Sequence, residues 1–273
     1  KEKENLPYFS NNEDMVVQDD IDIVFECLNG LEPANTLIQK ALKKGKHVIS
    51  SNKAVVATYL DTYLELEKEY GGSIQVEACV AGGIPFIDAL LKLKRLEPLQ
   101  GYEGIFNGTS NYILDSMQKN NLDFEDVLKE AQNKGYAEKD PSNDIDGVDV
   151  YYKTKISNSL AFNTPIVDIP YYAGIRTIKM LDIKFIKMNN KVIRHLSISR
   201  QIDDKIISII APCCMDENDF LANVPSNYNA QKILSHSFDT LGYYGQGAGQ
   251  LPTAQAMVQN ALDTLENKER KIV

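Results

Sequence analysis

Short apolar runs alternate with amphipathic stretches over the first eighty residues. The run at 21–27 (IDIVFEC) is rich in Ile, Val and Phe, which is typical of a strand buried on both faces. After Pro33, apolar residues recur at helical spacing as far as Leu42, two lysines follow, and Gly45 supplies a stop. The next patterns predict a strand at 47–50, a helix from about 58 to 70 and a strand at 74–79. Strands that alternate with single helices imply a parallel sheet, here half of a doubly wound nucleotide-binding domain.

The pattern changes near residue 81 and predicts a second unit. AGGIP (81–85) leads into a predicted helix, and 102–114 has the pattern of strand, turn and helix. The other predicted elements are a helix near 86–95, an amphipathic helix within 123–140 that ends at Gly135, a helix at 146–162, strands at 192–198 and 205–211, and a Gly-rich turn before a helix within 243–265. We therefore expect a second α/β domain built on a sheet.

Composition excludes several classes of protein. Lys and Arg number 29 against 38 Asp and Glu, a formal charge of −9, which argues against nucleic acid or an anionic membrane as the main partner. No apolar run reaches the roughly 18 residues of a membrane-spanning helix, and the first residues lack the apolar segment of a signal peptide. Four irregularly spaced cysteines suit neither a disulfide framework nor a zinc site. We expect a soluble, cytoplasmic protein with reduced thiols.

One expected feature of a dinucleotide fold is not found. Such folds open with a strand and a Gly-rich turn that places the pyrophosphate at a helix N-terminus. Nothing before Ile21 has this pattern, and Gly30 is the first glycine. Two explanations are open: the sequence starts late, or the first βαβ unit is missing, which would weaken cofactor binding.

Five segments, in order, resemble homoserine dehydrogenases. They are 21–54, 76–85, NGTSNYIL (107–114), GYAEKDPSNDIDGVDVYYK (135–153) and YYGQGAGQLPTAQA (243–256). The block at 135–153 is the most specific of them. The departures are Ser110 where Thr is usual, Leu28-Asn29 near the cofactor loop, and Gln259-Asn260. No C-terminal regulatory domain is recognised, so feedback control by threonine through such a domain is not expected.

The resemblance implies a fold, a reaction and an assembly. The fold is α/β: an incomplete nucleotide-binding domain with a partial Rossmann-type parallel sheet (1–78), a catalytic and dimerisation domain (79–251), and a helix at about 252–273 that packs back on the first domain. The reaction is the NAD- or NADP-dependent interconversion of L-homoserine and L-aspartate 4-semialdehyde, in threonine and methionine biosynthesis. The assembly is a homodimer. The residue that decides between NAD and NADP would lie in the strand that is not found.

Lys153 is the leading candidate for the group that exchanges a proton with the substrate oxygen. Reduction of an aldehyde leaves a developing alkoxide that needs a cationic proton donor, and oxidation uses the same group as a base. Asp149 lies four residues earlier on a predicted helix, so the two heads can converge on one oxygen. A lysine acts as a base near neutrality only if its pKa is lowered, and a carboxylate opposes this. We expect Asp149 to hold the hydroxyl and aim Lys153, with oxidation favoured at alkaline pH; the alternative is an ordinary solvated ion pair.

Other residues are assigned to ligands. Lys53 lies beyond the end of a predicted parallel strand, where open α/β sheets bind ligands, although a surface lysine is the alternative. The resemblance implies that Lys53 reaches cofactor and substrate and that Glu138 binds the substrate ammonium group, for which a carboxylate is the natural partner. It also implies substrate contacts from Tyr136, Thr109 and Asp144, and cofactor contacts from Asn29, Gly30, Ser51, Asn52 and Gly247.

A cation site and two rival functions complete the expectations. The resemblance implies a sodium-like ion held by oxygens, mostly main-chain carbonyls, around Glu77, Val80, Gly82 and Ile84; a glycine hinge without an ion is the alternative. One rival function is a cofactor-incompetent relative or fragment with a structural or dimerisation role. The other is a dehydrogenase for a related amino-acid aldehyde.

Overall fold

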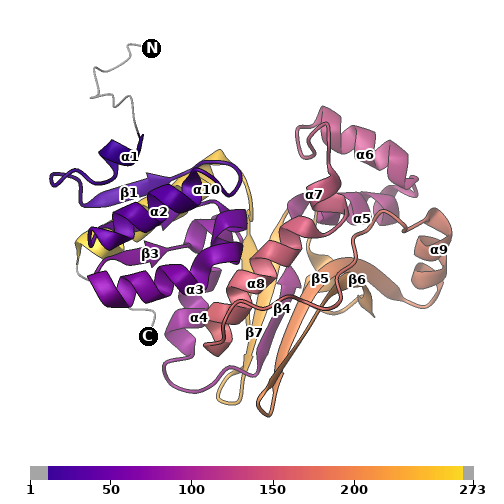
Figure 1. Ribbon diagram of the computed structural model, residues 1–273. Helices are drawn as coiled ribbons and strands as arrows, with labels where there is room; N and C mark the ends of the chain where they lie inside the picture. Colours follow the sequence, from indigo (N-terminus) through magenta and orange to yellow (C-terminus); the bar gives the residue numbers. More distant parts are fainter. Residues whose placement is uncertain (1–11, 267–273) are drawn as a thin grey trace.

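Two β-sheets organise the computed structural model, which describes residues 12–266 (Figure 1). The first sheet has three parallel strands in the order β1-β2-β3. Its strands are β1 (Ile23–Glu26), β2 (His47–Ser50) and β3 (Ser73–Gln75). The helices of this unit are α1 (Asn12–Met15), α2 (Ala34–Lys43) and α3 (Lys53–Tyr70), and η1 (Glu77–Cys79) follows β3.

The second sheet is antiparallel and has the order β6-β5-β4-β7-β8. Its strands are β4 (Gly101–Ile105), β5 (Lys191–Ile202), β6 (Lys205–Asp216), β7 (Asn229–Ser235) and β8 (Asp239–Gly245). The helices of this unit are α4 (Phe86–Leu93), α5 (Gly108–Asn120), α6 (Phe124–Asn133), α7 (Ser142–Ile145), α8 (Val148–Phe162), α9 (Met180–Met188) and η2 (Leu221–Asn223). The last helix, α10 (Gln250–Leu265), returns to the first sheet.

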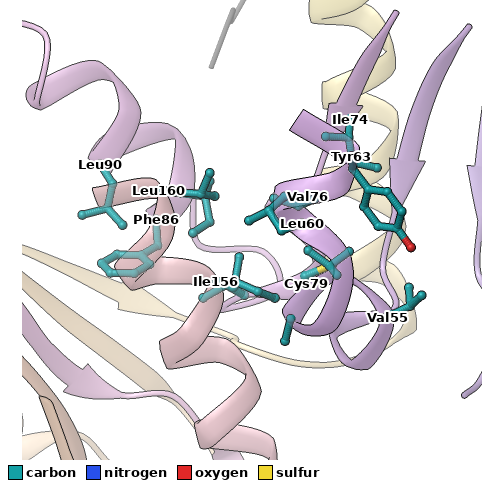
Figure 2. Close-up of a cluster of buried hydrophobic side chains, with 14 of the residues drawn as sticks. Val55, Leu60, Tyr63, Ile74, Val76, Cys79, Phe86, Leu90, Ile156 and Leu160 are labelled. Atoms are coloured by element: carbon teal, nitrogen blue, oxygen red, sulfur yellow. The ribbon is translucent and has the colours of Figure 1, made fainter. Parts of the chain in front are cut away.

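One hydrophobic core joins the two units. Figure 2 shows Ile156 and Leu160 of α8 between Leu90 of α4 and Leu60 of α3, and all four side chains belong to one buried cluster. A smaller cluster holds α10 against the first sheet, where Met257 packs with Ile49. The shared core fixes α8 between the two sheets. No helix in residues 12–266 is long and apolar enough to span a membrane.

The expected α/β class, with a parallel sheet and a second sheet-based unit, is confirmed. Some boundaries were wrong. The expected strand at 74–79 is three residues long, because the chain turns into η1 at Glu77. The helix expected from about residue 58 begins at Lys53, because the Asn52 side chain accepts a hydrogen bond from the Val55 amide and caps it.

Other expectations failed because of tertiary context. Strand β1 is not buried on both faces: it lies at the edge of its sheet within the described residues, and Phe25 is 49% exposed. The pattern did not indicate α9, β7 or β8. The hairpin β7-β8 carries Asn229 and Gln231 at fully buried positions, so apolar alternation is weak there.

Candidate active site

Two adjoining cavities lie beyond the carboxyl ends of β1 and β2, where the two units meet. Their volumes are about 480 and 570 Å³. The residues that line both are Ser51, Lys53, Glu138, Asp144 and Asp149. Ligands bind at this end of open parallel sheets, and the cavities contain charged and polar side chains from both units. The shared residues therefore mark a single candidate site.

The charged centre of this site is the pair Lys153 and Asp149 at the start of α8. Both residues are buried, at 7% and 6% exposed. The Lys153 ammonium donates to Asp149 Oδ2 and to the carbonyl of Phe106, each at 2.7 Å. An ammonium group has three donors, so one remains without a protein partner among the described residues. Because Lys153 lines the larger cavity, that donor is available to a ligand there.

Asp149 holds two cations at once. Its Oδ1 lies 3.2 Å from the Lys53 ammonium, which comes from the first residue of α3 in the other unit. Burial alone would raise the pKa of the Asp149 carboxyl, but the charges of Lys153 and Lys53 outweigh burial and lower the pKa to about 2. The same carboxylate raises the pKa of Lys53. Asp149 is therefore ionised at neutral pH and ties the two units together at the site.

Asn107 is a member of the site that was not predicted as a site residue. Its amide Nδ2 donates to Asp149 Oδ2 at 2.9 Å and to Asp144 Oδ1 at 2.7 Å, and its Oδ1 accepts from the Ser110 amide and caps α5. Burial and the neighbouring Asp149 charge raise the pKa of Asp144. In the sequence, Asn107 is an asparagine immediately before a predicted helix. This position indicates a helix cap, but it does not indicate contacts with two carboxylates.

The loop after β1 is fixed by a buried carboxylate. Glu26 accepts from the Ser50 hydroxyl at 2.6 Å and from the Leu28 amide at 2.7 Å. Asn52 then donates its side-chain amide to the carbonyl of Gly30, which has a φ of +81°. The residues predicted to contact the cofactor, apart from Gly247, line the smaller cavity: Asn29, Gly30, Ser51, Asn52 and Lys53. The structure thus brings these five residues together.

The predicted substrate residues line the larger cavity. Thr109 donates its hydroxyl to the carbonyl of Tyr136 at 2.6 Å, and the Tyr136 ring packs edge-on against Tyr112 with centroids 5.0 Å apart. Glu138 is exposed and lines both cavities. Thr109 and Tyr136 line the larger one with Lys153. All four predicted substrate residues, including Asp144, therefore border the space that Lys153 faces.

Gly247 and Gly82 approach each other closely at the edge of the larger cavity. A Cβ on Gly82 would lie 2.7 Å from the Gly247 carbonyl, and a Cβ on Gly247 would lie 1.9 Å from the Asn229 amide. Only glycine fits at both positions. The turn at 246–249 is therefore pressed against the segment that joins the two units.

The predicted cation residues occupy that joining segment. The Glu77 carboxylate accepts from the amides of Ile87 and Asp88, at 3.2 and 2.7 Å, and so caps α4. Val80 and Ile84 are buried, and Gly82 lines the larger cavity. Within residues 12–266, no group of three His, Cys, Asp or Glu side chains is arranged to hold a metal ion. A cation held mainly by carbonyls stays a prediction.

Other residues that line the larger cavity were not predicted. They include Cys79, Gly108, Asn227 and Thr253. Gly108 lies against Asn227, since a Cβ on the glycine would be 2.6 Å from the asparagine carbonyl. This contact joins two segments more than a hundred residues apart, so local sequence patterns give no signal for it.

Family models match both units of the chain. The model described as homoserine dehydrogenase matches residues 85–262, and the model described as homoserine dehydrogenase, NAD binding domain, matches residues 1–77. A homoserine dehydrogenase of Neisseria gonorrhoeae is 38% identical over 92% of this chain and 58% of its own length. One of Pseudomonas aeruginosa is 34% identical over 92% of this chain and 58% of its own length. The chain thus spans about three-fifths of the length of these curated relatives.

Solved structures agree with these matches. The crystal structure of a homoserine dehydrogenase from Thiobacillus denitrificans has a TM-score of 0.92 and 37% identity, covering 97% of this chain and 62% of that one. A hyperthermophilic archaeal homoserine dehydrogenase in complex with NADPH has a TM-score of 0.82 and 26% identity, covering 95% of this chain and 76% of that one. Together with the two family models, these similarities show that the chain belongs to the homoserine dehydrogenase family.

Proposed function

We propose that this chain interconverts L-homoserine and L-aspartate 4-semialdehyde with NAD or NADP, as part of threonine and methionine biosynthesis. The observation that carries the proposal is the Lys153 ammonium, which is buried, held by two acceptors at 2.7 Å, and left with one donor facing the larger cavity. A fixed cationic donor is what a developing alkoxide requires.

The proton and the hydride are handled separately. A bound nicotinamide supplies or accepts the hydride at the substrate carbon. In the direction of reduction, Lys153 donates its free N–H proton to the oxygen that receives negative charge, and it regains a proton from solvent. In the direction of oxidation, neutral Lys153 removes the hydroxyl proton. Asp149 keeps Lys153 in place through a 2.7 Å contact with its Oδ2, and its Oδ1 lies 3.2 Å from the Lys53 ammonium. We infer that both cations act on the substrate oxygen.

The cofactor fits the smaller cavity and its border with the larger one. Backbone and side-chain groups of Asn29, Gly30 and Ser51 face that space, and the turn at Gly30 is open, since a Cβ added there would meet no atom within 4 Å. Lys53 and Gly247 both line the larger cavity. We infer that these residues, with Asn52 positioning the Gly30 carbonyl, hold the nicotinamide end of the cofactor.

The substrate fits the larger cavity. Glu138 is the exposed acid on its wall and is available to an ammonium group. Thr109, Tyr136 and Asp144 line the same cavity, and Asp144 accepts a hydrogen bond from the Asn107 amide. We infer that the amino group of the substrate binds at Glu138 and its reacting oxygen at Lys153.

The remaining assignments are proposals of the same kind. We infer a cytoplasmic homodimer, with boundaries between units near residues 78 and 251 and a sodium-like ion at the 77–84 segment. The free cysteines Cys27, Cys79, Cys213 and Cys214 support a reducing compartment, and the packing of α10 on the first sheet supports the boundaries.

The test is an activity and binding measurement on the chain of residues 1–273. We expect homoserine-dependent reduction of NAD or NADP, detected by absorbance, and saturable quenching or enhancement of NADH or NADPH fluorescence. Absence of both, with circular dichroism showing a folded protein, would favour the cofactor-incompetent alternative and remove the proposed reaction.

A further inference from the structure

The buried face of α8 that contacts the second sheet is polar, although apolar packing is the usual way to join a helix to a sheet. Thr154, Ser157 and Asn158 lie on the helix about one and a half to two and a half turns beyond Asp149, and each is at most 3% exposed. The other side of α8 carries Ile156 and Leu160, which pack in the apolar core (Figure 2). The helix is therefore buried on two sides of opposite character.

Thr154 and Asn158 of the polar face are hydrogen bonded to the sheet. The Thr154 hydroxyl lies 2.8 Å from the Ser197 hydroxyl of β5 and 2.7 Å from the carbonyl of Val150, one turn earlier. The hydroxyl of Tyr102 in β4 donates to Asn158 Oδ1 at 2.8 Å. None of these side-chain atoms is left without a partner.

The network continues to the outer strand of the sheet. Asn158 donates its Nδ2 to the Ser208 hydroxyl of β6 at 2.9 Å, and the Ser208 hydroxyl lies 2.8 Å from that of Ser199 in β5. The Ser157 hydroxyl donates to the carbonyl of Lys153. Hydrogen bonds thus connect α8 to three neighbouring strands, β4, β5 and β6.

Such a network restrains the helix more narrowly than apolar contacts do. Apolar attraction is non-directional and tolerates sliding, whereas a hydrogen bond weakens steeply when its geometry changes. A buried polar group without its partner is costly, so any rotation or shift of α8 is opposed by several groups together. The contacts of Lys153 with Asp149 and Phe106, both at 2.7 Å, depend on that same helix position.

We propose that the network beneath α8 is a positioning device, in which Thr154, Ser197 and Asn158 set the register of α8 on the sheet and so aim Lys153 and Asp149 into the cavity. This inference rests on the proposed function for its catalytic consequence. The structural part of the inference is that the network fixes the position of the Lys153 ammonium. That part can be tested without measuring turnover. None of these three residues lines either cavity. They can therefore affect a bound ligand only through the position of α8.

The experiment replaces Thr154 with Val, which keeps the shape of the side chain and removes its hydroxyl. Thr58→Val is the matched control, because Thr58 is an exposed helical threonine whose hydroxyl donates only to the carbonyl of Ala54, one turn earlier. Thr154→Ser restores the hydroxyl and is the rescue variant. Should Thr154→Val fail to fold, Ser197→Ala removes the same hydrogen bond between α8 and β5 from the other partner.

Two readouts decide the outcome. In a crystal structure of Thr154→Val we expect α8 to move and the Lys153 contact with Asp149 or Phe106 to lengthen beyond 3.5 Å, about the hydrogen-bond limit. We expect kcat to fall about tenfold to a hundredfold, with cofactor KM within about threefold of wild type, as for a small misplacement of a reacting group. Thr58→Val and Thr154→Ser should behave like wild type in both readouts.

The proposal is overturned if the Lys153 contacts in Thr154→Val match those of wild type, or if they change while kcat does not. If the wild-type chain shows no turnover, the proposed function fails on its own, and the crystal structures still decide whether the network sets the position of Lys153.

Discussion

Replacing Asp149 with Asn tests the charge balance of the site. The carboxylate holds Lys153 at 2.7 Å and Lys53 at 3.2 Å, and its pKa falls from the ordinary 3.8 to about 2. One pKa unit corresponds to about 1.4 kcal/mol of differential stability. The ionised form therefore contributes about 2 kcal/mol to the free energy of unfolding at neutral pH. The amide is nearly the same size but carries no charge.

The loss should exceed this contribution, because the change also leaves the Lys153 ammonium buried without its anion and facing Lys53. We expect the free energy of unfolding of Asp149→Asn at pH 7 to be about 2–4 kcal/mol below that of wild type. Urea denaturation followed by circular dichroism measures it. Asp126→Asn, an exposed carboxylate of α6, is the control and should change stability by less than about 0.5 kcal/mol.

The lowered pKa of Asp149 also determines how the free energy of unfolding changes with pH. The folded-state pKa lies below the unfolded one, so the stabilisation is complete above pH 4 and is lost as the pH falls toward 2. About half of the carboxylate contribution should remain at pH 3. The gap between wild type and Asp149→Asn should therefore be constant from pH 5 to 8 and smaller at pH 3. A gap below about 0.5 kcal/mol at pH 7, or one that does not narrow in acid, would refute the reasoning.

Two further substitutions probe the walls of the site. Glu138→Gln should raise KM for homoserine about tenfold to a hundredfold with little change in kcat, because a charge-assisted hydrogen bond to the ammonium group is lost; an unchanged KM in steady-state assays counts against the assignment. Gly247→Ala should lower stability by about 1–3 kcal/mol in thermal melts, because its Cβ would overlap the Asn229 amide. Gly242→Ala, which meets only the ring of Phe220 at 3.3 Å, is the control, and an equal loss in both variants would contradict the steric argument.

Local sequence patterns predicted the parts of the fold that are locally determined. Strand β2 follows from a short buried run that contains Val48 and Ile49. Helix α2 follows from apolar residues at helical spacing and from the stop at Gly45, whose φ is +69°. The pairing of Asp149 with Lys153 on one helix face also follows from spacing, and the structure has the contact at 2.7 Å.

Features that depend on tertiary context could not be predicted in this way. Nothing in the segment around Asn107 shows that its amide lies between two carboxylates of another helical region, because that contact spans about forty residues of chain. The hairpin of β7 and β8 was missed because Asn229 and Gln231 are polar at buried positions. The spacing of apolar residues predicts a strand or helix only where the buried residues of that element are apolar.

The most direct test of the account is the turnover of Lys153→Ala in both directions, measured beside the cofactor dissociation constant. If Lys153 transfers the proton, kcat should fall at least about a hundredfold in homoserine oxidation and in semialdehyde reduction, while cofactor affinity stays within about threefold. Near-normal turnover by a folded Lys153→Ala protein would contradict the account.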